Sequence, residues 1–454
     1  MNKNELKQLC IKTIDENRDE IIRIGNEIYK NPELGYKEFK STEIVKNAMK
    51  NLDGRLETEI AYTGCKIVAN EEKSGPRVAI IGELDSVVCA DHKDANELGN
   101  IHACGHNVQI ANMIGAAFGI LKSGVFKHLD GSMEFIAIPA EECVDYEYRA
   151  NLQKENKIKY IGGKQEYLYR NGFDNTDIIL QCHMIGLEEG KECIINTDTN
   201  GFMSKMVTFY GKSSHAGFAP HEGVNALNMA QLAMNNIHAQ RETFKDEDKV
   251  RVSMVISNGG DLVNVVPSKV TMEIMVRAFS IDAMTDANKK VNRALQAAAL
   301  ALGGNVEIKD SIGYLPMKTD RNLGDIYKQN MIEYASLIED NFIMDYQTAG
   351  STDLGDISQI MPCLHVWSNG ITGGLHTEEY NMEDEEKAYI LPAKMLALSL
   401  IDLLYDDAKQ AKDIIGKFDP FFTKEQYLNF LDDYVATHNF NYCLLYTSPS
   451  PRDS

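Results

Sequence analysis

The sequence predicts a two-domain α/β fold in which a small α+β domain interrupts a larger α/β domain. Short apolar runs that alternate with helices indicate a mostly parallel sheet covered by helices on both faces. A central stretch departs from this pattern, because its elements follow the ferredoxin-like order strand, helix, strand, strand, helix, strand. The 454 residues are enough for two or three domains of about 150 residues each.

The larger domain begins with a helical region and continues with strands. Isoleucines between Ile11 and Ile28 recur at helical spacing, and this pattern ends at Asn31-Pro32. Apolar runs predict buried strands at 77–84, 132–139 and 177–183 and an apolar helix at 108–121.

The middle of the chain predicts the small domain. Residue patterns indicate strands at 205–210, 250–257, 269–279 and 305–310 and helices at 224–240 and 282–302. The α/β pattern then returns with a strand at 363–367 and a helix at 384–404. We therefore expect a catalytic α/β domain over 1–196 and 313–442, interrupted by an inserted domain over 197–312.

The end of the chain, residues 443–454, stands apart from this fold. It reads CLLYTSPSPRDS, and Leu-Leu-Tyr-Thr-Ser is encoded by the sequencing-adapter sequence CTCTTATACACATCT. We interpret this end as a translated adapter and exclude it from the fold. Cys443 is then not a cysteine of the natural protein.

The composition restricts the classes of function. Lys and Arg total 46 against 67 Asp and Glu, and the formal charge of −21 disfavours nucleic acid and anionic membranes as partners. No run reaches the roughly 18 apolar residues of a membrane span. The charged N-terminus lacks a signal core, and nine unpatterned cysteines indicate reduced thiols. We therefore expect a cytoplasmic protein.

His102, Cys104 and His106 form the densest group of candidate metal ligands. They alternate in the sequence HACGH, and alternate residues of an extended chain share one face. A helix is expected from Asn107 onward, and its N-terminus favours the thiolate form of Cys104. The alternative interpretation is a loop with structural histidines.

Further candidate ligands follow predicted strand ends, where α/β proteins bind their ligands. Glu141 and Glu142 follow one buried strand, and two such carboxylates are costly there without a cation. A solvated acidic turn is the alternative for this pair. His183 ends another apolar strand, and His376 lies in a glycine-rich turn. We prefer His376 to His365, whose bulky apolar neighbours indicate a core position.

Seven motifs then give the chain a family resemblance, and they occur in the order PELGYKE, GELDS, HACGH, PAEE, GKSSHAG, GGDLVNVVP and GSTDLGDIS. From about residue 20 to 400, the chain resembles the bacterial amidohydrolases and metallopeptidases that include hippurate hydrolase, indole-acetyl amino-acid hydrolase and the catalytic component of aminobenzoyl-glutamate hydrolase. The resemblance implies a co-catalytic zinc-peptidase-like domain with a dinuclear metal site. It also implies that the inserted domain is a lid through which two chains form a homodimer.

The resemblance implies a role for each matching residue. Cys104 becomes a thiolate that bridges two metal ions, and the terminal ligands are His106, Glu142, His183 and His376. Glu141 becomes the general base. Asp85 of GELDS is placed behind the ligands, where more distant metallopeptidases have a histidine ligand.

The same resemblance places substrate residues in the inserted domain. His215 is implied to polarise the scissile carbonyl, often from across a dimer interface. Asn264 and Arg277 are implied to contact the substrate carboxylate. A structural ion pair is an equal alternative for Arg277, because it lies in a strand.

This donor set favours hydrolysis. One thiolate and one carboxylate oppose the four positive charges of two divalent ions, and the surplus lowers the pKa of bound water, to about 7 at single-zinc sites. Thiolate and imidazole ligands suit zinc, and manganese, cobalt and nickel are alternatives.

Two features depart from the resemblance. Asn107 stands where many relatives have Asp. The charged segment 143–173 replaces a shorter glycine-rich connection. This segment either shapes an unusual substrate pocket or forms a solvated helical excursion.

Together these patterns predict a metal-dependent amidohydrolase that cleaves an N-acyl amino acid or small peptide-like substrate. A cysteine hydrolase with Cys104 as nucleophile is one alternative, and a chelator separates the two because it abolishes only metal-dependent activity. A binding protein that keeps the fold without turnover is the other. No motif selects the acyl group, the amine or the metal.

Overall fold

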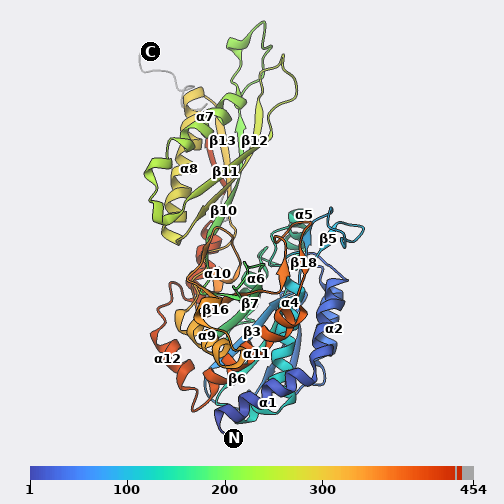
Figure 1. The fold of residues 1–454 in the computed structure, drawn as a ribbon. Coiled ribbons are helices and arrows are strands. Elements are labelled where there is room, and N and C mark those ends of the chain that lie inside the picture. Colours follow the sequence, from blue (N-terminus) through green and yellow to red (C-terminus); the bar gives the residue numbers. More distant parts are fainter. Residues whose placement is uncertain (435–436, 442–454) are drawn as a thin grey trace. The chain divides into compact units, whose positions relative to one another are not determined.

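The computed structural model describes residues 1–434 and 437–441, and the described chain divides into two compact units (Figure 1). The first unit comprises 1–198, 317–348 and 356–423, and the second comprises 199–316, 349–355 and the C-terminal residues from 424 onward. The segment that we interpret as a translated adapter, 443–454, lies outside the described residues.

The first unit is built on an eight-stranded mixed sheet. Its order is β1 (Arg55–Ile60), β2 (Gly64–Ala69), β6 (Ser132–Ile138), β3 (Arg77–Glu83), β7 (Ile178–Met184), β16 (Cys363–Ser368), β8 (Cys193–Ile195), β14 (Phe342–Met344). The four central strands β6, β3, β7 and β16 run parallel to one another. Every residue of β6 and β7 is buried, as expected for strands that are covered on both faces.

The helices of the first unit surround this sheet. They are α1 (Lys3–Glu16), α2 (Arg18–Tyr29), α3 (Phe39–Met49), α4 (His106–Ala117), α5 (Tyr146–Lys154), α6 (Gly163–Tyr169), α9 (Arg321–Ala335), α11 (Leu391–Leu404) and α12 (Lys409–Lys417). The apolar helices α4 and α11 are almost wholly buried, and they pack against each other and against β3 and β7. This packing fixes the start of α4, which carries His106.

The parallel strands bring their carboxyl ends to one edge of the sheet. Asp85 follows β3, Glu141 and Glu142 follow β6, and His183 is the last but one residue of β7. The side chains predicted to carry the chemistry of the first unit are therefore collected at one edge, as in other open α/β sheets.

The second unit contains the predicted ferredoxin-like order. Its elements are β10 (Gly201–Tyr210), α7 (Ala226–His238), β11 (Arg251–Asn258), β12 (Lys269–Ala278), α8 (Ile281–Leu302) and β13 (Asn305–Ile312). The antiparallel sheet has the order β11, β12, β10, β13, and α7 packs against α8. Burial alternates along β12, so one face of the sheet covers the two helices and the other does not.

The second unit is larger than the predicted insertion of 197–312, because later segments return to it. Residues 349–355 belong to it, and so do α13 (Lys424–Tyr434) and β19 (Thr437–Asn441). β19 pairs with β13 as a fifth, antiparallel strand. This pairing occupies the backbone hydrogen-bonding groups of β13, which would otherwise be a sheet edge.

The segment 143–173 differs from a solvated excursion. It forms α5 and α6, and it buries Arg149, Lys164, Glu166 and Tyr167 almost completely. Buried charges are costly without partners, so this segment is part of the packed first unit rather than an exposed addition.

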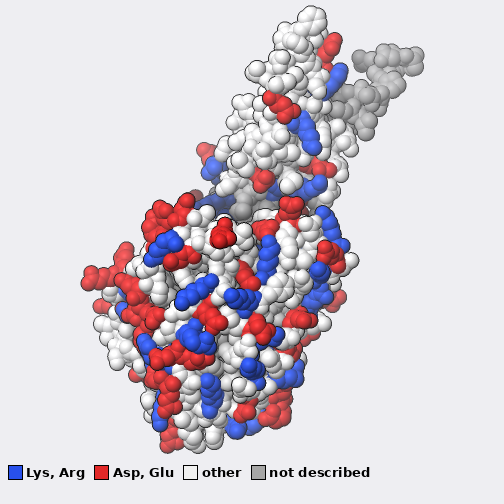
Figure 2. Space-filling model, turned by 90° about the vertical axis from the view of Figure 1, so that its right-hand side faces the viewer, with Lys and Arg blue, Asp and Glu red and all other residues white. Residues whose placement is uncertain are grey.

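Neither the helices nor the surface suggests a membrane span or a basic face. Within the described residues, no single helix is both long and apolar enough to cross a membrane, and only the pair Glu386–Leu404 and Lys409–Lys417, bent by 86°, approaches this together. Figure 2 shows one face on which acidic and basic side chains are interspersed. The excess negative charge is therefore not accompanied by a continuous basic surface on that face.

Candidate metal centre

The HACGH segment forms a buried turn at the start of α4. Gly105 precedes the helix with a positive φ of 77°, a conformation that glycine adopts without strain. Cys104 and His106 are 6% and 0% exposed. The backbone N–H of His376 donates to the Ala103 carbonyl at 2.8 Å, which ties the glycine-rich turn to this segment. Residues far apart in the chain are thereby brought together.

The structure brings the five predicted metal ligands into two overlapping groups. In each group, one ligand atom per residue lies within 4.8 Å of the others; the groups are Cys104 with His106 and His183, and Cys104 with Glu142 and His376. Cys104 is common to both. The arrangement has the form of two adjacent cation sites that share a sulfur, which is the donor set that the resemblance implied.

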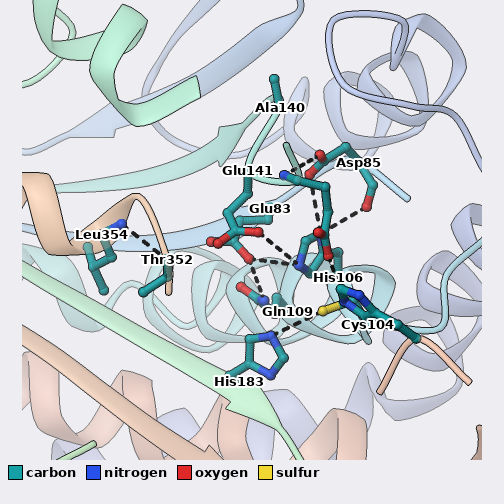
Figure 3. Close-up of polar contacts among 12 residues, drawn as sticks. Glu83, Asp85, Cys104, His106, Gln109, Ala140, Glu141, His183, Thr352 and Leu354 are labelled. Atoms are coloured by element: carbon teal, nitrogen blue, oxygen red, sulfur yellow. Dashed lines mark hydrogen bonds and ion pairs between the residues drawn. The ribbon is translucent and has the colours of Figure 1, made fainter. Parts of the chain in front are cut away.

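Individual contacts within these groups are short. Cys104 Sγ lies 3.6 Å from His183 Nε2, and His376 Nε2 lies 3.0 Å from Glu142 Oε1 (Figure 3 shows the cysteine with His106 and His183). His376 is the most accessible of the five, with its side chain 47% exposed. The centre is thus buried on one side and open at His376.

Asp85 connects two of the ligand residues. Its Oδ2 accepts the backbone N–H of Glu142 at 2.8 Å, and its Oδ1 and carbonyl oxygen lie 3.2 and 2.9 Å from His106 Nδ1. Because Nδ1 faces acceptors, the ring proton belongs there and Nε2 is the atom available to a cation. Asp85 thus lies behind the ligands, where we expected it.

The turn that carries Glu141 and Glu142 is held by several hydrogen bonds. Ala140 has a positive φ of 56°, which is unfavourable for a residue with a Cβ. Its N–H donates to the buried carboxyl of Glu38 at 2.8 Å, and its carbonyl accepts from Gly163 N at 3.0 Å. The Arg149 guanidinium donates to the Glu142 carbonyl. These partners fix a strained turn that points the two glutamates in different directions.

The interaction of Cys104 with the imidazoles dominates the electrostatics. Burial alone would raise the pKa of the Cys104 thiol, but the charge of His106 and hydrogen bonds with the histidines hold this pKa well below its usual value. Hydrogen bonds with Cys104 and Glu142 raise the pKa of His376 to about 11. Burial and the charge of Cys104 raise the pKa of Glu142 to about 7. A thiolate enclosed by imidazoles is a donor set that zinc prefers.

His365 does not join either group. It is 2% exposed on β16, and Trp367 Nε1 donates to its Nε2 at 3.3 Å. The Trp367 ring also packs beside His183, with ring centres 5.2 Å apart. The preference for His376 over His365 therefore agrees with the arrangement of the donors.

The predicted substrate residues belong to the second unit. His215 and Asn264 lie on neighbouring loops, where His215 pairs with Val265 and Ala216 N donates to the Asn264 carbonyl at 2.9 Å. Arg277 lies on β12, and its Nη1 donates to Ala349 O at 3.2 Å and to Ser351 Oγ at 3.0 Å. The GSTDLGDIS motif thus contacts a residue of the inserted domain.

Sequence reasoning missed two buried charged residues of this region. Glu83, at the end of β3, has Oε2 3.0 Å from His106 Nε2, and Lys164 of α6 forms an ion pair with its other oxygen. A signal for Glu83 was present, because residues 83 and 85 of GELDS share one face of an extended chain. No local signal indicates Lys164, whose partner is 81 positions away.

The family comparison identifies the inserted domain. Residues 197–302 match the peptidase dimerisation domain of the M20 peptidases. This range coincides closely with the unit that the β-α-β-β-α-β pattern predicted.

Homologous proteins extend the likeness along the chain. The Xaa-Arg dipeptidase of Mus musculus is 28% identical over 427 residues, which cover 89% of this chain and 90% of the relative. The N-acyl-L-amino acid amidohydrolase of Geobacillus stearothermophilus is 24% identical over 328 residues, or 70% of this chain and 81% of the relative. Their names, like those of other homologues, describe hydrolases of linear amides.

Solved structures share the fold. The YXEP protein of Bacillus subtilis, described as a dinuclear metal binding peptidase from the M20 family, has a TM-score of 0.66 at 19% identity and covers 86% of this chain and 99% of its own. The aminobenzoyl-glutamate utilization protein of Klebsiella pneumoniae has a TM-score of 0.64 at 15% identity, with coverages of 86% and 97%. The predicted fold class and family resemblance are confirmed: the chain has the M20 peptidase fold with its dimerisation domain.

Proposed function

We propose that this chain is a metal-dependent amidohydrolase that cleaves the amide bond of an N-acyl amino acid or a small peptide-like substrate. The observation that carries the proposal is the pair of donor groups that share Cys104. The named activities of its homologues, which include a dipeptidase and an N-acyl-L-amino acid amidohydrolase, support the same substrate class.

The residues of the centre fit two divalent cations. Cys104, His106 and His183 would hold one, and Cys104, Glu142 and His376 the other. When bound, two such ions acidify a water molecule and polarise the carbonyl of an amide. Zinc suits the sulfur and imidazole donors, and manganese, cobalt and nickel are alternatives.

Glu141 is the proposed general base. It is 7% exposed and follows the strained Ala140, and its Oε2 lies 4.0 Å from His106 Nε2, beside the donors but outside both ligand groups (Figure 3). In this role the Glu141 carboxylate accepts a proton from the attacking water. It then returns that proton to the amine that leaves.

His215 is the proposed donor to the oxygen of the scissile carbonyl. Its Nδ1 accepts the backbone N–H groups of Gly217 at 3.2 Å and Phe218 at 3.0 Å. A nitrogen that accepts carries no proton, so the neutral ring is protonated at Nε2. That N–H is suited to stabilise the negative charge that develops on the carbonyl oxygen.

Asn264 and Arg277 are the proposed contacts for the substrate carboxylate. An amide and a guanidinium both donate hydrogen bonds, and a guanidinium binds a carboxylate in a bidentate manner. The bonds of Arg277 to residues 349 and 351 orient its side chain within the second unit. We further propose that two chains associate through this dimerisation domain and that the protein acts in the cytoplasm.

A cysteine hydrolase is the second candidate. The 3.6 Å contact between Cys104 Sγ and His183 Nε2 favours it, because such a pair activates a thiolate nucleophile. The two other imidazoles and the carboxylate around the sulfur favour metal binding instead. Treatment with a chelator separates the candidates: activity that survives complete metal removal would support the cysteine nucleophile.

The substitution Glu141→Gln tests the proposed chemistry. We expect the variant to keep its metal and to lose turnover by about 10²–10⁴-fold, since an amide cannot accept the proton. Metal content is measured by mass spectrometry, and hydrolysis is measured with a panel of N-acyl amino acids and dipeptides. A near-normal rate in the metal-loaded variant would remove Glu141 from this role.

A further inference from the structure

Glu83 is a buried carboxylate that the proposed mechanism does not use. It ends β3, it is 1% exposed, and it lies between the sheet and the metal centre. Its Oε2 accepts from Gln109 Nε2 at 2.7 Å and lies 3.0 Å from His106 Nε2 (Figure 3). One oxygen of Glu83 therefore faces the ligand atom of a proposed metal ligand.

The other oxygen is held by the inserted segment and by a neighbouring strand. Lys164, which is fully buried in α6, forms an ion pair with Oε1, and Gln181 of β7 donates to the same oxygen at 2.8 Å. The carboxylate is thus oriented from three sides. Its negative charge is balanced by an ammonium group that comes from the segment 143–173.

The contact between Glu83 and His106 is unfavourable without a positive charge between them. His106 Nδ1 faces the carbonyl oxygen and carboxylate of Asp85 and therefore carries the ring proton. The neutral ring then presents the lone pair of Nε2 to a carboxylate oxygen 3.0 Å away. Two acceptors at this distance repel one another.

A proton on Nε2 does not resolve this contact well. Nε2 has no hydrogen-bonding partner of acceptable geometry among the described residues, although the Glu83 oxygen is close. A metal ion needs no such geometry of the N–H bond. Glu83, His106 and Glu141 also offer ligand atoms that all lie within 4.8 Å of one another.

We propose that Glu83 belongs to the metal centre as a further oxygen donor to the cation held by His106, and that Lys164 of the inserted segment holds it there. This inference rests on the proposed metal-dependent function. A third anionic donor would reduce the surplus positive charge that acidifies water, and the ammonium of Lys164 restores it. The segment 143–173 thereby contributes to the metal centre itself.

The experiment compares Glu83→Gln with Glu134→Gln in the full chain. Glu134 is a matched control, because it is also 1% exposed and paired with a buried lysine, Lys66 at 3.0 Å, on the neighbouring strand β6. Zinc stoichiometry is measured by mass spectrometry, and zinc affinity is measured by competition with a chromophoric chelator. The fluorescence of Trp367, which packs beside His183, reports occupancy independently of activity.

We expect two zinc ions per chain in the wild type and in Glu134→Gln. In Glu83→Gln, one of the two ions should bind about 10–100-fold more weakly, the range found when a group that supports a metal site is removed. If Glu83→Gln does not fold, Glu83→Asp, which withdraws the oxygen by one carbon–carbon bond, should weaken the same ion.

The outcomes separate this inference from the proposed function. Two ions with unchanged affinity in the folded Glu83 variant would overturn the role of Glu83 and leave the proposed function intact. A wild-type protein that binds no zinc at Cys104 would overturn both.

Discussion

Asp85 illustrates how one residue determines the geometry of the centre. Both of its carboxylate oxygens accept from donors, one from the Glu142 backbone and the other from the His106 ring. It therefore aligns a ligand from the strand end with a ligand from the first turn of α4. Ligands held in this way lose less freedom when a metal binds.

The substitution Asp85→Asn tests this role. An amide can accept with only one of its two atoms, so its NH₂ group must face either the Glu142 N–H or the His106 N–H. We expect zinc affinity to fall by about 10–100-fold while the chain remains folded. Competition with a chromophoric chelator measures the affinity.

A matched control for this variant is Asp177→Asn. Asp177 accepts from the backbone N–H of Arg77 at 2.8 Å, at the opposite end of the same strand β3. It should leave zinc binding unchanged. Equal zinc affinity in the two variants would show that Asp85 does not position the ligands.

At the scale of the elements, α6 packs closely against the end of β6. A Cβ built at Gly163 would lie 1.5 Å from the Pro139 carbonyl oxygen, which is backbone and cannot rotate away. This close approach lets Gly163 N bond to the Ala140 carbonyl and brings Lys164 to Glu83. The turn that carries Glu141 thus depends on a glycine outside its own motif.

The substitution Gly163→Ala should force α6 away from this turn. We expect a loss of stability of about 1–3 kcal/mol, as for other overpacked sites, together with a loss of activity. Chemical denaturation and the hydrolysis assay measure the two effects. Gly416→Ala in α12 is the control, because its Cβ would meet nothing within 4 Å. Wild-type stability and turnover in Gly163→Ala would contradict the close packing.

The central elements could be predicted because their signals are local. The runs at 77–84, 132–139 and 177–183 correspond to β3, β6 and β7, and each consists of apolar residues that need no distant partner to be recognised. The same holds for the donors at strand ends. Their position relative to the strand, rather than their chemistry alone, indicated that they meet at one edge of the sheet.

The remaining features depend on contacts between distant segments. The ion pair of Lys164 with Glu83, and the addition of β19 to the edge of β13, join residues that nothing in their neighbourhood connects. The N-terminal isoleucine stripe also divides into α1 and α2 at Asn17, although its apolar spacing continues across the break. Periodicity shows which face is buried, but it does not show where a helix is interrupted.

At the scale of the whole molecule, buried carboxyl groups make stability depend on pH. Burial and the charge of Asp85 raise the pKa of Glu38 to about 8, and its carboxyl accepts from Thr63 Oγ1 and Ala140 N. The folded chain therefore binds a proton that the unfolded chain releases at lower pH. This contribution to stability is complete below the unfolded pKa of about 4.3 and is lost as the pH rises through about 8.

A comparison with Glu38→Gln isolates this effect. As the pH rises from 5 to 9, the wild type should lose free energy of unfolding relative to the variant, which carries no titrating group at this position. Urea denaturation of the metal-free proteins at several pH values measures the difference. A difference that is constant over this range would show that Glu38 keeps the same protonation state in the folded and unfolded chains.

The central claim concerns the convergence of four distant segments on a pair of cations. It is tested most directly by X-ray diffraction from zinc-loaded crystals, with anomalous maps recorded on both sides of the zinc absorption edge. The account predicts two zinc peaks per chain that share the sulfur of Cys104, with His106 and His183 at one and Glu142 and His376 at the other. A map without zinc at Cys104, or with these side chains directed away from any bound ion, would contradict it.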